Sequence, residues 1–196
     1  MRFTGSTLGP SVPRRGNLLT RQAGRAVLSA LGWRLEGRWP DLRRMVVVLA
    51  PHTSNWDFFL AICVVVALGV RAHWIGKHTL FRWPFGRLMR YLGGTPIVRD
   101  ASIGRVAQIV EQIKRSDEFI LGVAPEGTRR RAPRWKSGFY HVAVGAGVPI
   151  LLAYLDYSQR VVGLGPVFHP TGDERSDLAS IRSFYDKRWA RFPDQV

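Results

Sequence analysis

The chain has 196 residues, 46% of them hydrophobic, which is enough for one domain with its own core and excludes a disordered protein. Its 29 Lys and Arg outnumber its 14 Asp and Glu, and the net charge of +15 predicts an acidic partner: an anionic membrane, a phosphate-bearing substrate, an acidic carrier protein or nucleic acid. The single cysteine, Cys63, excludes an internal disulfide and favours a reducing compartment.

The N-terminal part contains a predicted leader and a predicted helix. Residues 1–16 mix Gly, Pro, Ser, Thr and Arg without periodicity and are expected to form a flexible leader. Apolar side chains at helical spacing then predict an amphipathic helix over 17–33 with a basic face. This pattern fits a helix packed on the core and a helix lying on a membrane surface equally well.

The longest apolar run, residues 58–70, has thirteen residues, whereas a helix that spans a bilayer needs roughly 20. It is therefore expected to be a buried helix. The N-terminus has arginines but no apolar core followed by a cleavage site before residue 30, so no signal peptide is expected. Together these features predict a cytoplasmic protein that is peripheral on the inner face of the cell membrane.

Apolar runs rich in β-branched residues alternate with segments of helical periodicity along the rest of the chain. Strands are expected at 45–50, 72–75, 95–100, 119–124, 148–155 and 161–167, and residues 35–40 form either a short strand or a loop. Helices are expected from the turn after residue 52 to residue 70 and at 84–91, 102–115, 139–146 and 177–192. The alternation predicts an α/β fold: a single-domain sandwich over residues 17–196, with a mixed, largely parallel sheet flanked by helices and an N-terminal amphipathic helix.

One polar motif, His52-Thr53-Ser54-Asn55-Trp56-Asp57, directly follows the strand predicted at 45–50 and contains good helix N-caps. On one continuous helix, a spacing of five would turn His52 and Asp57 roughly 140° apart, whereas a turn between them brings them together. An imidazole held by a carboxylate through one nitrogen leaves the other free as a general base. Because no serine or cysteine nucleophile is placed beside it by an elbow motif, the proton would come from a substrate hydroxyl. The alternative is a capped turn without chemistry.

A second polar cluster, Glu126-Gly127-Thr128-Arg129, follows the strand predicted at 119–124 and Pro125. In α/β sheets, ligands bind beyond the carboxyl ends of the strands, so the two clusters are expected to share one site. Four histidines lack the paired spacing of metal ligands, and no metal is predicted. These histidines are His73, His78, His141 and His169.

Four blocks occur in order, HTSNWD, PIVR, PEGTR and VPI, with the segment from Lys77 to Phe85 between the first two. In this order they resemble the glycerol-phosphate and lysophosphatidic acid acyltransferase superfamily of bacterial phospholipid synthesis, over about residues 46–155. The sequence departs from the family pattern because a second proline does not follow Val148-Pro149-Ile150 closely and because the chain is shorter than most members. It therefore looks like a short bacterial branch of the superfamily.

The resemblance implies that His52 and Asp57, the HX4D pair, are catalytic, with His52 deprotonating an acceptor hydroxyl that attacks an acyl thioester directly. It also implies that Arg99 and Arg129 hold the phosphate of the acceptor, a role that suits guanidinium groups. Surface arginines of a very basic protein are the alternative. Further substrate-binding positions implied by the family are Lys77, Glu126, Gly127, Thr128 and Lys136.

Two of these positions keep open alternatives: Glu126 either fixes an arginine or contacts acceptor hydroxyls, and Lys136 either helps to bind phosphate or thioester groups or is only solvated. The expected function is transfer of a fatty acyl group from acyl-CoA or acyl carrier protein to lysophosphatidic acid or a related glycerol-phosphate lipid, without a cofactor. One alternative is O-acylation of another lipid or a polyene by the same dyad. The other is a non-catalytic basic protein that binds membrane or nucleic acid, although no nucleic-acid signature is present.

Overall fold

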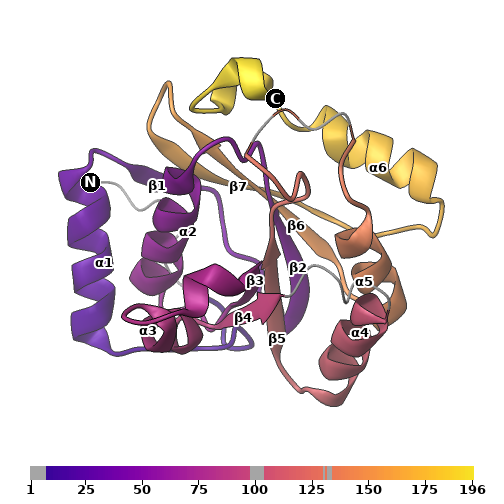
Figure 1. The fold of residues 1–196 in the computed structure, drawn as a ribbon, viewed down its shortest axis with the longest axis horizontal. Coiled ribbons are helices and arrows are strands. Elements are labelled where there is room, and N and C mark those ends of the chain that lie inside the picture. Colours follow the sequence, from indigo (N-terminus) through magenta and orange to yellow (C-terminus); the bar gives the residue numbers. More distant parts are fainter. Residues whose placement is uncertain (1–7, 98–103, 130, 132–133) are drawn as a thin grey trace.

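A seven-stranded sheet runs through the middle of the molecule in the computed structural model, which describes residues 8–97, 104–129, 131 and 134–196 (Figure 1). The order of its strands is β1-β7-β6-β2-β5-β3-β4. The described pairs are parallel except for β6 with β7. The strands are β1 (Arg34–Glu36), β2 (Arg44–Leu49), β3 (His73–Lys77), β4 (Gly94–Ile97), β5 (Phe119–Val123), β6 (Ile150–Asp156) and β7 (Val161–Phe168).

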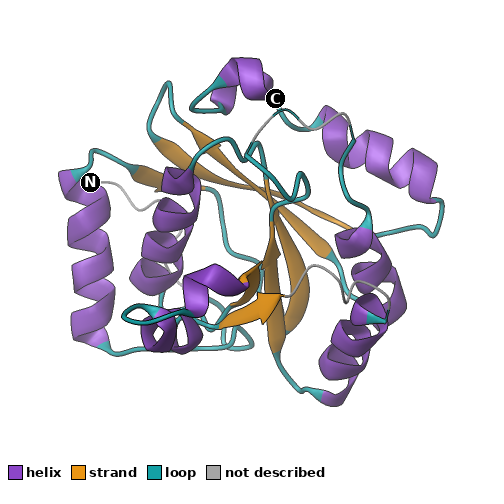
Figure 2. Cartoon of the chain, viewed as in Figure 1, coloured by secondary structure: helices purple, strands orange, loops and turns teal. Residues whose placement is uncertain are grey.

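Helices cover both sides of the sheet, with α1, α2 and α3 on one side and α4, α5 and α6 on the other (Figures 1 and 2). Their bounds are α1 (Leu18–Ala30), α2 (Asn55–Leu68), α3 (Gly86–Tyr91), α4 (Arg105–Arg115), α5 (Gly138–Ala146) and α6 (Glu174–Ser183). Three short 3₁₀ helices are η1 (His78–Phe81), η2 (Lys187–Trp189) and η3 (Pro193–Gln195). The predicted α/β sandwich with a mixed, largely parallel sheet is thus confirmed.

Alternate residues of the central strand β2 enter two separate cores. Met45 packs with Leu28 of α1 and Leu60 of α2 on one side of the sheet. Val46 and Val48 face the other side, where helices α4, α5 and α6 contribute Ile113, Tyr140 and Ile181 to the second core. Because successive side chains of a strand point to opposite faces, a central strand buried on both faces has a continuous apolar sequence.

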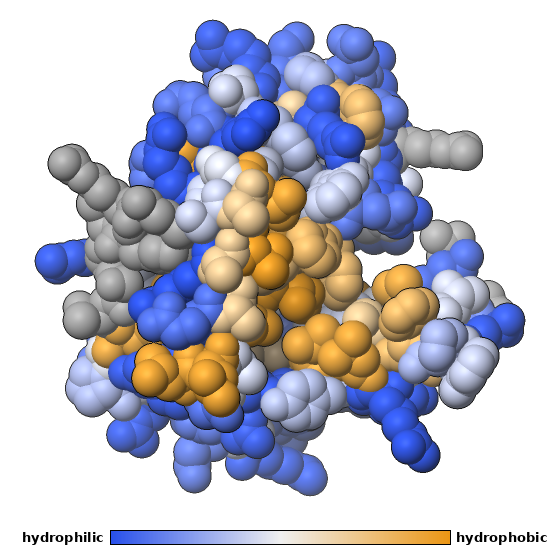
Figure 3. Space-filling model, turned by 90° about the vertical axis from the view of Figure 1, so that its left-hand side faces the viewer, coloured by the Kyte–Doolittle hydropathy of each residue, from blue (hydrophilic) through white to orange (hydrophobic). Residues whose placement is uncertain are grey.

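Helix α1 packs closely on α2 through Gly24, since a Cβ at this position would lie 2.7 Å from the Ala67 amide nitrogen. Gly24 and Leu28 are its buried residues, whereas Leu18, Leu19 and Val27 are exposed. The helix therefore packs on the core by one face and presents apolar side chains outward by another, on the side seen in Figure 3. Within the described ranges, no helix combines the length and the apolar content that crossing a bilayer requires.

The first and last segments that the structure describes both contact the rest of the domain. Leu8 and Val12 are buried, so the described part of the predicted leader packs on the core. The prediction of a closing helix over 177–192 was wrong in extent, because α6 ends at Ser183. Beyond that point, Trp189 stacks on Tyr154 with the ring centroids 4.1 Å apart, and this tertiary contact replaces further helical turns.

Candidate active site

The carboxyl ends of four parallel strands, β2, β3, β5 and β6, meet at one edge of the sheet. His52 follows β2, Glu126 follows β5, and Tyr157 directly follows β6. Lys77 is the last residue of β3 and is exposed. Polar side chains that are far apart in the sequence are thereby gathered at the edge where α/β sheets bind ligands.

The HTSNWD motif forms a turn that ends in a capping box at the start of α2. Ser54 is the N-cap, and its hydroxyl accepts a hydrogen bond from the Trp56 N–H at 3.2 Å. Asp57 reaches back, and its Oδ2 accepts from the N–H groups of Thr53 and Ser54, both at 2.8 Å. The first turn of a helix favours a carboxylate because unpaired N–H groups and the helix dipole point there. Local sequence therefore fixes the place of Asp57.

The imidazole of His52 faces this carboxylate. Its Nδ1 lies 3.1 Å from Asp57 Oδ2, although the ring N–H is not aligned for a straight hydrogen bond. The His52 side chain is 17% exposed, whereas that of Asp57 is 1% exposed. With Nδ1 turned toward the acid, Nε2 is the nitrogen left for a substrate hydroxyl, and hydrogen bonds of this kind commonly tighten when substrate binds.

Tyr157 completes the environment of Asp57 and was missed by the sequence reasoning. Its hydroxyl donates to Asp57 Oδ1 at 2.5 Å, across 100 residues of sequence. Burial alone would raise the pKa of Asp57, but His52 and the hydrogen bonds from Tyr157 and Ser54 outweigh it and lower this pKa below its ordinary value. Tyr157 directly follows β6, and His52 follows β2 in a similar way. The position of Tyr157 after a predicted strand was therefore the sequence signal that could have identified this residue.

Glu126 supports the backbone of His52. Its Oε1 accepts a hydrogen bond from the His52 N–H at 3.1 Å, while its Oε2 is buried and has no hydrogen-bond partner within the described residues. Burial raises the pKa of Glu126, and the charge of Asp57 acts in the same direction. The structure thus gives Glu126 a contact that neither sequence-based interpretation included.

The basic residues predicted to bind substrate are placed unequally. Arg129 Nη1 donates to Asn55 Oδ1 at the first position of α2, next to the dyad. The side chain of Lys136 crosses over Gly127, whose φ is +62°, and a Cβ there would lie 2.9 Å from Lys136 Cε. Thr128 is exposed in the same turn. Arg99 lies outside the described residues.

A second missed contact comes from the C-terminal segment. The Phe192 N–H donates to Thr53 Oγ1 at 3.3 Å, and the guanidinium of Arg191 lies 5.7 Å from the Trp56 ring centroid. The tail therefore closes over the HTSNWD turn and adds a cation beside it. No sequence signal pointed to this contact, because a continuous helix was expected there.

The sequence model of the Acyltransferase family matches residues 35–154, more than half of the chain, and this range includes the dyad and Glu126. The chain belongs to the acyltransferase family. Curated relatives include the 1-acyl-sn-glycerol-3-phosphate acyltransferase of Escherichia coli (strain K12), which is 30% identical over 125 residues, covering 60% of this chain and 49% of that protein. The protein of the same name from Haemophilus influenzae is 24% identical over 148 residues, covering 71% and 60% respectively.

This member of the acyltransferase family thus spans between 49% and 60% of the length of these curated relatives. Among solved structures, the 1-acyl-sn-glycerophosphate (LPA) acyltransferase PlsC from Thermotoga maritima matches with a TM-score of 0.59, covering 88% of this chain and 80% of that one. At 19% sequence identity this likeness concerns the fold alone. Tyr157 and Arg191 lie beyond the range that the family model matches.

Proposed function

We propose that the protein is an O-acyltransferase that moves a fatty acyl group from an acyl thioester, acyl-CoA or acyl carrier protein, to a hydroxyl of lysophosphatidic acid or a related glycerol-phosphate lipid. The observation that carries this proposal is the 3.1 Å approach of His52 Nδ1 to a carboxylate that three further donors hold in place. The names of the curated relatives support the acceptor class. The protein acts as a peripheral enzyme on the inner face of the cell membrane.

In the proposed reaction, His52 Nε2 takes the proton of the acceptor hydroxyl while its oxygen attacks the thioester carbonyl. The new C–O bond forms, the C–S bond breaks, and the proton on His52 passes to the departing thiolate, so ester and free thiol are the products. Asp57 stabilises the imidazolium that forms in between, as an acid does in a triad. Each step uses side chains of this chain, and no cofactor is required.

The acceptor phosphate is assigned to the cations beside the dyad. Arg129 and Lys136 are exposed around the turn at Gly127, and Lys77 ends the neighbouring strand β3. Guanidinium groups form charge-assisted, often bidentate, bonds with phosphate. Arg99 is proposed to share this role. The same cations suit the phosphates of an acyl-CoA donor, and the test below distinguishes phosphate-bearing from phosphate-free acceptors.

The test is release of free thiol by purified protein from acyl-CoA and from acyl carrier protein, against a panel of hydroxyl acceptors with and without phosphate. Turnover with a glycerol-phosphate lipid is expected, and His52→Ala and Asp57→Ala should each lower it by roughly 10²–10⁴-fold. His169→Ala is the matched control, because His169 is exposed and follows the antiparallel strand β7, away from the carboxyl edge. Substantial transfer by a folded His52→Ala variant would end the proposal.

A further inference from the structure

Charge is distributed unevenly between the two sides of the molecule. Residues 1–35 and 58–99 together contain twelve Lys and Arg and no Asp or Glu, although the chain has 14 acidic residues. In the fold the described parts of these two stretches form α1, most of α2, and α3, which cover one side of the sheet, together with β3 and the edge strand β4 (Figure 1). Among the described residues of these stretches, Arg34 pairs with Glu36 and Arg71 pairs with Glu118, and this side as a whole still has an excess of cations.

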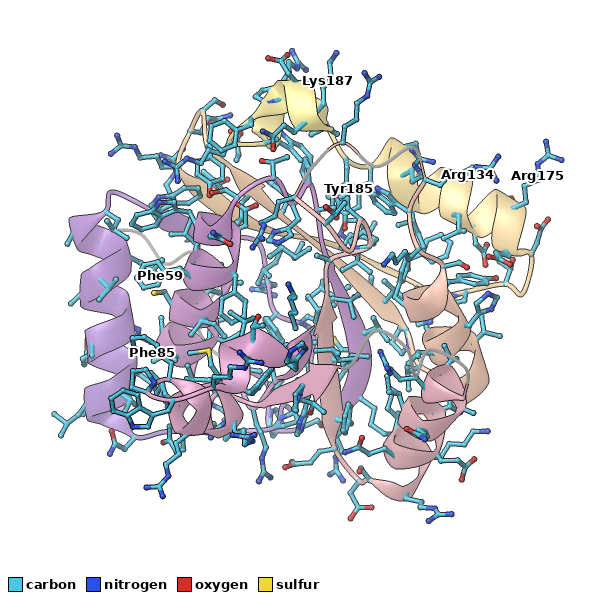
Figure 4. The ribbon with its side chains drawn as sticks, viewed as in Figure 1. Phe59, Phe85, Arg134, Arg175, Tyr185 and Lys187 are labelled. Carbon is cyan, nitrogen blue, oxygen red and sulfur yellow. The ribbon has the colours of Figure 1, made fainter. Side chains whose placement is uncertain are left out.

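Large apolar side chains are exposed on the same side. The loop between η1 and α3 presents Trp83 at 93% exposure and Phe85 at 64%, and the first turn of α1 presents Leu18 at 69% and Leu19 at 78%. Figure 3 shows apolar residues gathered in a band over this face, and Figure 4 places Phe85 and Phe59 on it. Soluble monomers rarely expose contiguous apolar surface of this kind without a partner.

An arginine pocket adjoins this apolar surface. The pocket has a volume of about 490 Å³ and is lined by Arg14, Arg15, Arg71 and Arg90, with His73 beside them. The guanidinium of Arg15 lies 4.1 Å from the ring centroid of the exposed Tyr91, which joins the pocket to the apolar surface. Glu118 pairs with Arg71 at 3.1 Å. Four cations against one carboxylate make this pocket suitable for a phosphate group.

We propose that this side of the molecule docks on an anionic phospholipid bilayer. Trp83 and Phe85 enter the interfacial region, where aromatic side chains are favoured, and the arginine pocket takes a headgroup phosphate. The exposed leucines of α1 favour a bilayer over nucleic acid, because aliphatic side chains gain free energy in lipid and not against a phosphate backbone. This proposal rests on the proposed function, since docking would bring the enzyme to its lipid acceptor.

The test is flotation of the full chain with liposomes of phosphatidylcholine alone or of phosphatidylcholine with phosphatidylglycerol. Wild type should bind the anionic vesicles more tightly. Trp83→Ala/Phe85→Ala should weaken binding to both vesicles by roughly tenfold or more, because two aromatic side chains leave the interface. Arg15→Gln/Arg90→Gln should reduce mainly the preference for anionic lipid.

Arg175→Gln/Lys187→Gln is the matched control, since it removes the same charge from the opposite end of the molecule (Figure 4). It should bind as wild type does. Equal loss from this control and from Arg15→Gln/Arg90→Gln would overturn the proposal, as would unchanged binding by Trp83→Ala/Phe85→Ala. Preferential binding of a nucleic-acid oligonucleotide that survives the Trp83→Ala/Phe85→Ala change would overturn it as well. Melting curves for each variant confirm folding, and all these side chains except Arg15 are exposed.

Catalysis and docking can fail separately. His52→Ala should bind vesicles as wild type does, because the dyad lies at the carboxyl edge of the sheet and the arginine pocket at the start of β3. Trp83→Ala/Phe85→Ala should keep thiol release with a monodisperse short-chain acceptor while losing it with an acceptor embedded in vesicles. Vesicle binding without any acyl transfer would leave the docking face in place and remove the proposed reaction. Equal transfer to both acceptors by Trp83→Ala/Phe85→Ala would leave the proposed reaction in place and overturn the proposed docking face.

Discussion

At the scale of single residues, the Asp57 carboxylate depends on a donor from a distant part of the chain. Tyr157→Phe removes the 2.5 Å hydrogen bond to Oδ1 and leaves the ring, which packs edge-on against Trp33. We expect kcat to fall roughly tenfold or more with KM nearly unchanged, because the carboxylate that positions His52 is less firmly held. Steady-state kinetics with the lipid acceptor measure this, and Tyr154→Phe in β6 is the control.

The same variant carries a pH signature. Asp57 has a lowered pKa in the folded protein, so the stability it contributes is present above its unfolded value of 3.8 and is lost as pH falls through the folded value. A hydrogen bond to a charged group contributes about 1.5–3 kcal/mol, and Tyr157→Phe should lose free energy of unfolding of this order at neutral pH. The difference from wild type should shrink as acid protonates Asp57. A difference independent of pH in urea titrations would contradict a role for Tyr157 through this carboxylate.

The contribution of Glu126 to stability should depend on pH in the opposite direction to that of Asp57. Its pKa is raised by burial, so between its unfolded value of 4.5 and its folded value the native protein holds a proton that the unfolded chain releases. Wild-type stability should therefore fall as pH rises through this window. Glu126→Gln removes this titration and keeps an oxygen that accepts from the His52 N–H. The thermal midpoint of the variant should therefore rise relative to that of wild type as the pH is raised from 4 to 8. Glu111→Gln, which removes a carboxylate from an exposed pair with Arg115, is the control.

At the scale of elements, the approach of α1 to α2 depends on one missing side chain. Gly24→Ala would place a Cβ 2.7 Å from the Ala67 nitrogen and 3.1 Å from the Cys63 carbonyl oxygen, which are backbone atoms that cannot turn aside. The gain in helix propensity, about 1 kcal/mol, is outweighed by overpacking of about 1–3 kcal/mol. We expect a lower midpoint in urea, whereas Ser29→Ala on the exposed side of α1 should be neutral or stabilising. A more stable Gly24→Ala variant would show that the helices can separate at little cost.

Elements whose pattern is local could be predicted from the sequence. The apolar run before His52 predicted β2, and the caps after it predicted the start of α2 with Asp57 in its first turn. Contacts between distant segments could not be predicted. The Tyr157 hydroxyl and the turn of the tail toward Thr53 depend on tertiary packing, for which periodicity carries no signal. The sequence left open whether α1 packs on the core or lies on a membrane for the same reason, because Gly24 on its buried face has no apolar side chain.

At the scale of the whole molecule, the net charge of +15 should speed the encounter with acidic donors. Coenzyme A and acyl carrier protein are both anionic, and a cationic surface raises the association rate of such partners in a way that salt screens. Raising the ionic strength from 0.1 M to 1 M shortens the screening length from roughly 10 Å to roughly 3 Å. We expect kcat/KM for an acidic donor to fall about tenfold over this range.

The control for this experiment is an uncharged short thioester offered with the same acceptor. Its kcat/KM should change little with salt, because no long-range attraction contributes to its encounter. Equal salt dependence for charged and uncharged donors would contradict the prediction, because salt would then be acting on binding of the acceptor or of the bilayer and not on the encounter with the donor. Since the cations that face lipid and the cations near the dyad lie at different places, Arg129→Gln/Lys136→Gln and Arg15→Gln/Arg90→Gln separate the two contributions. A donor that is steered to the dyad should be insensitive to the second pair in vesicle-free assays.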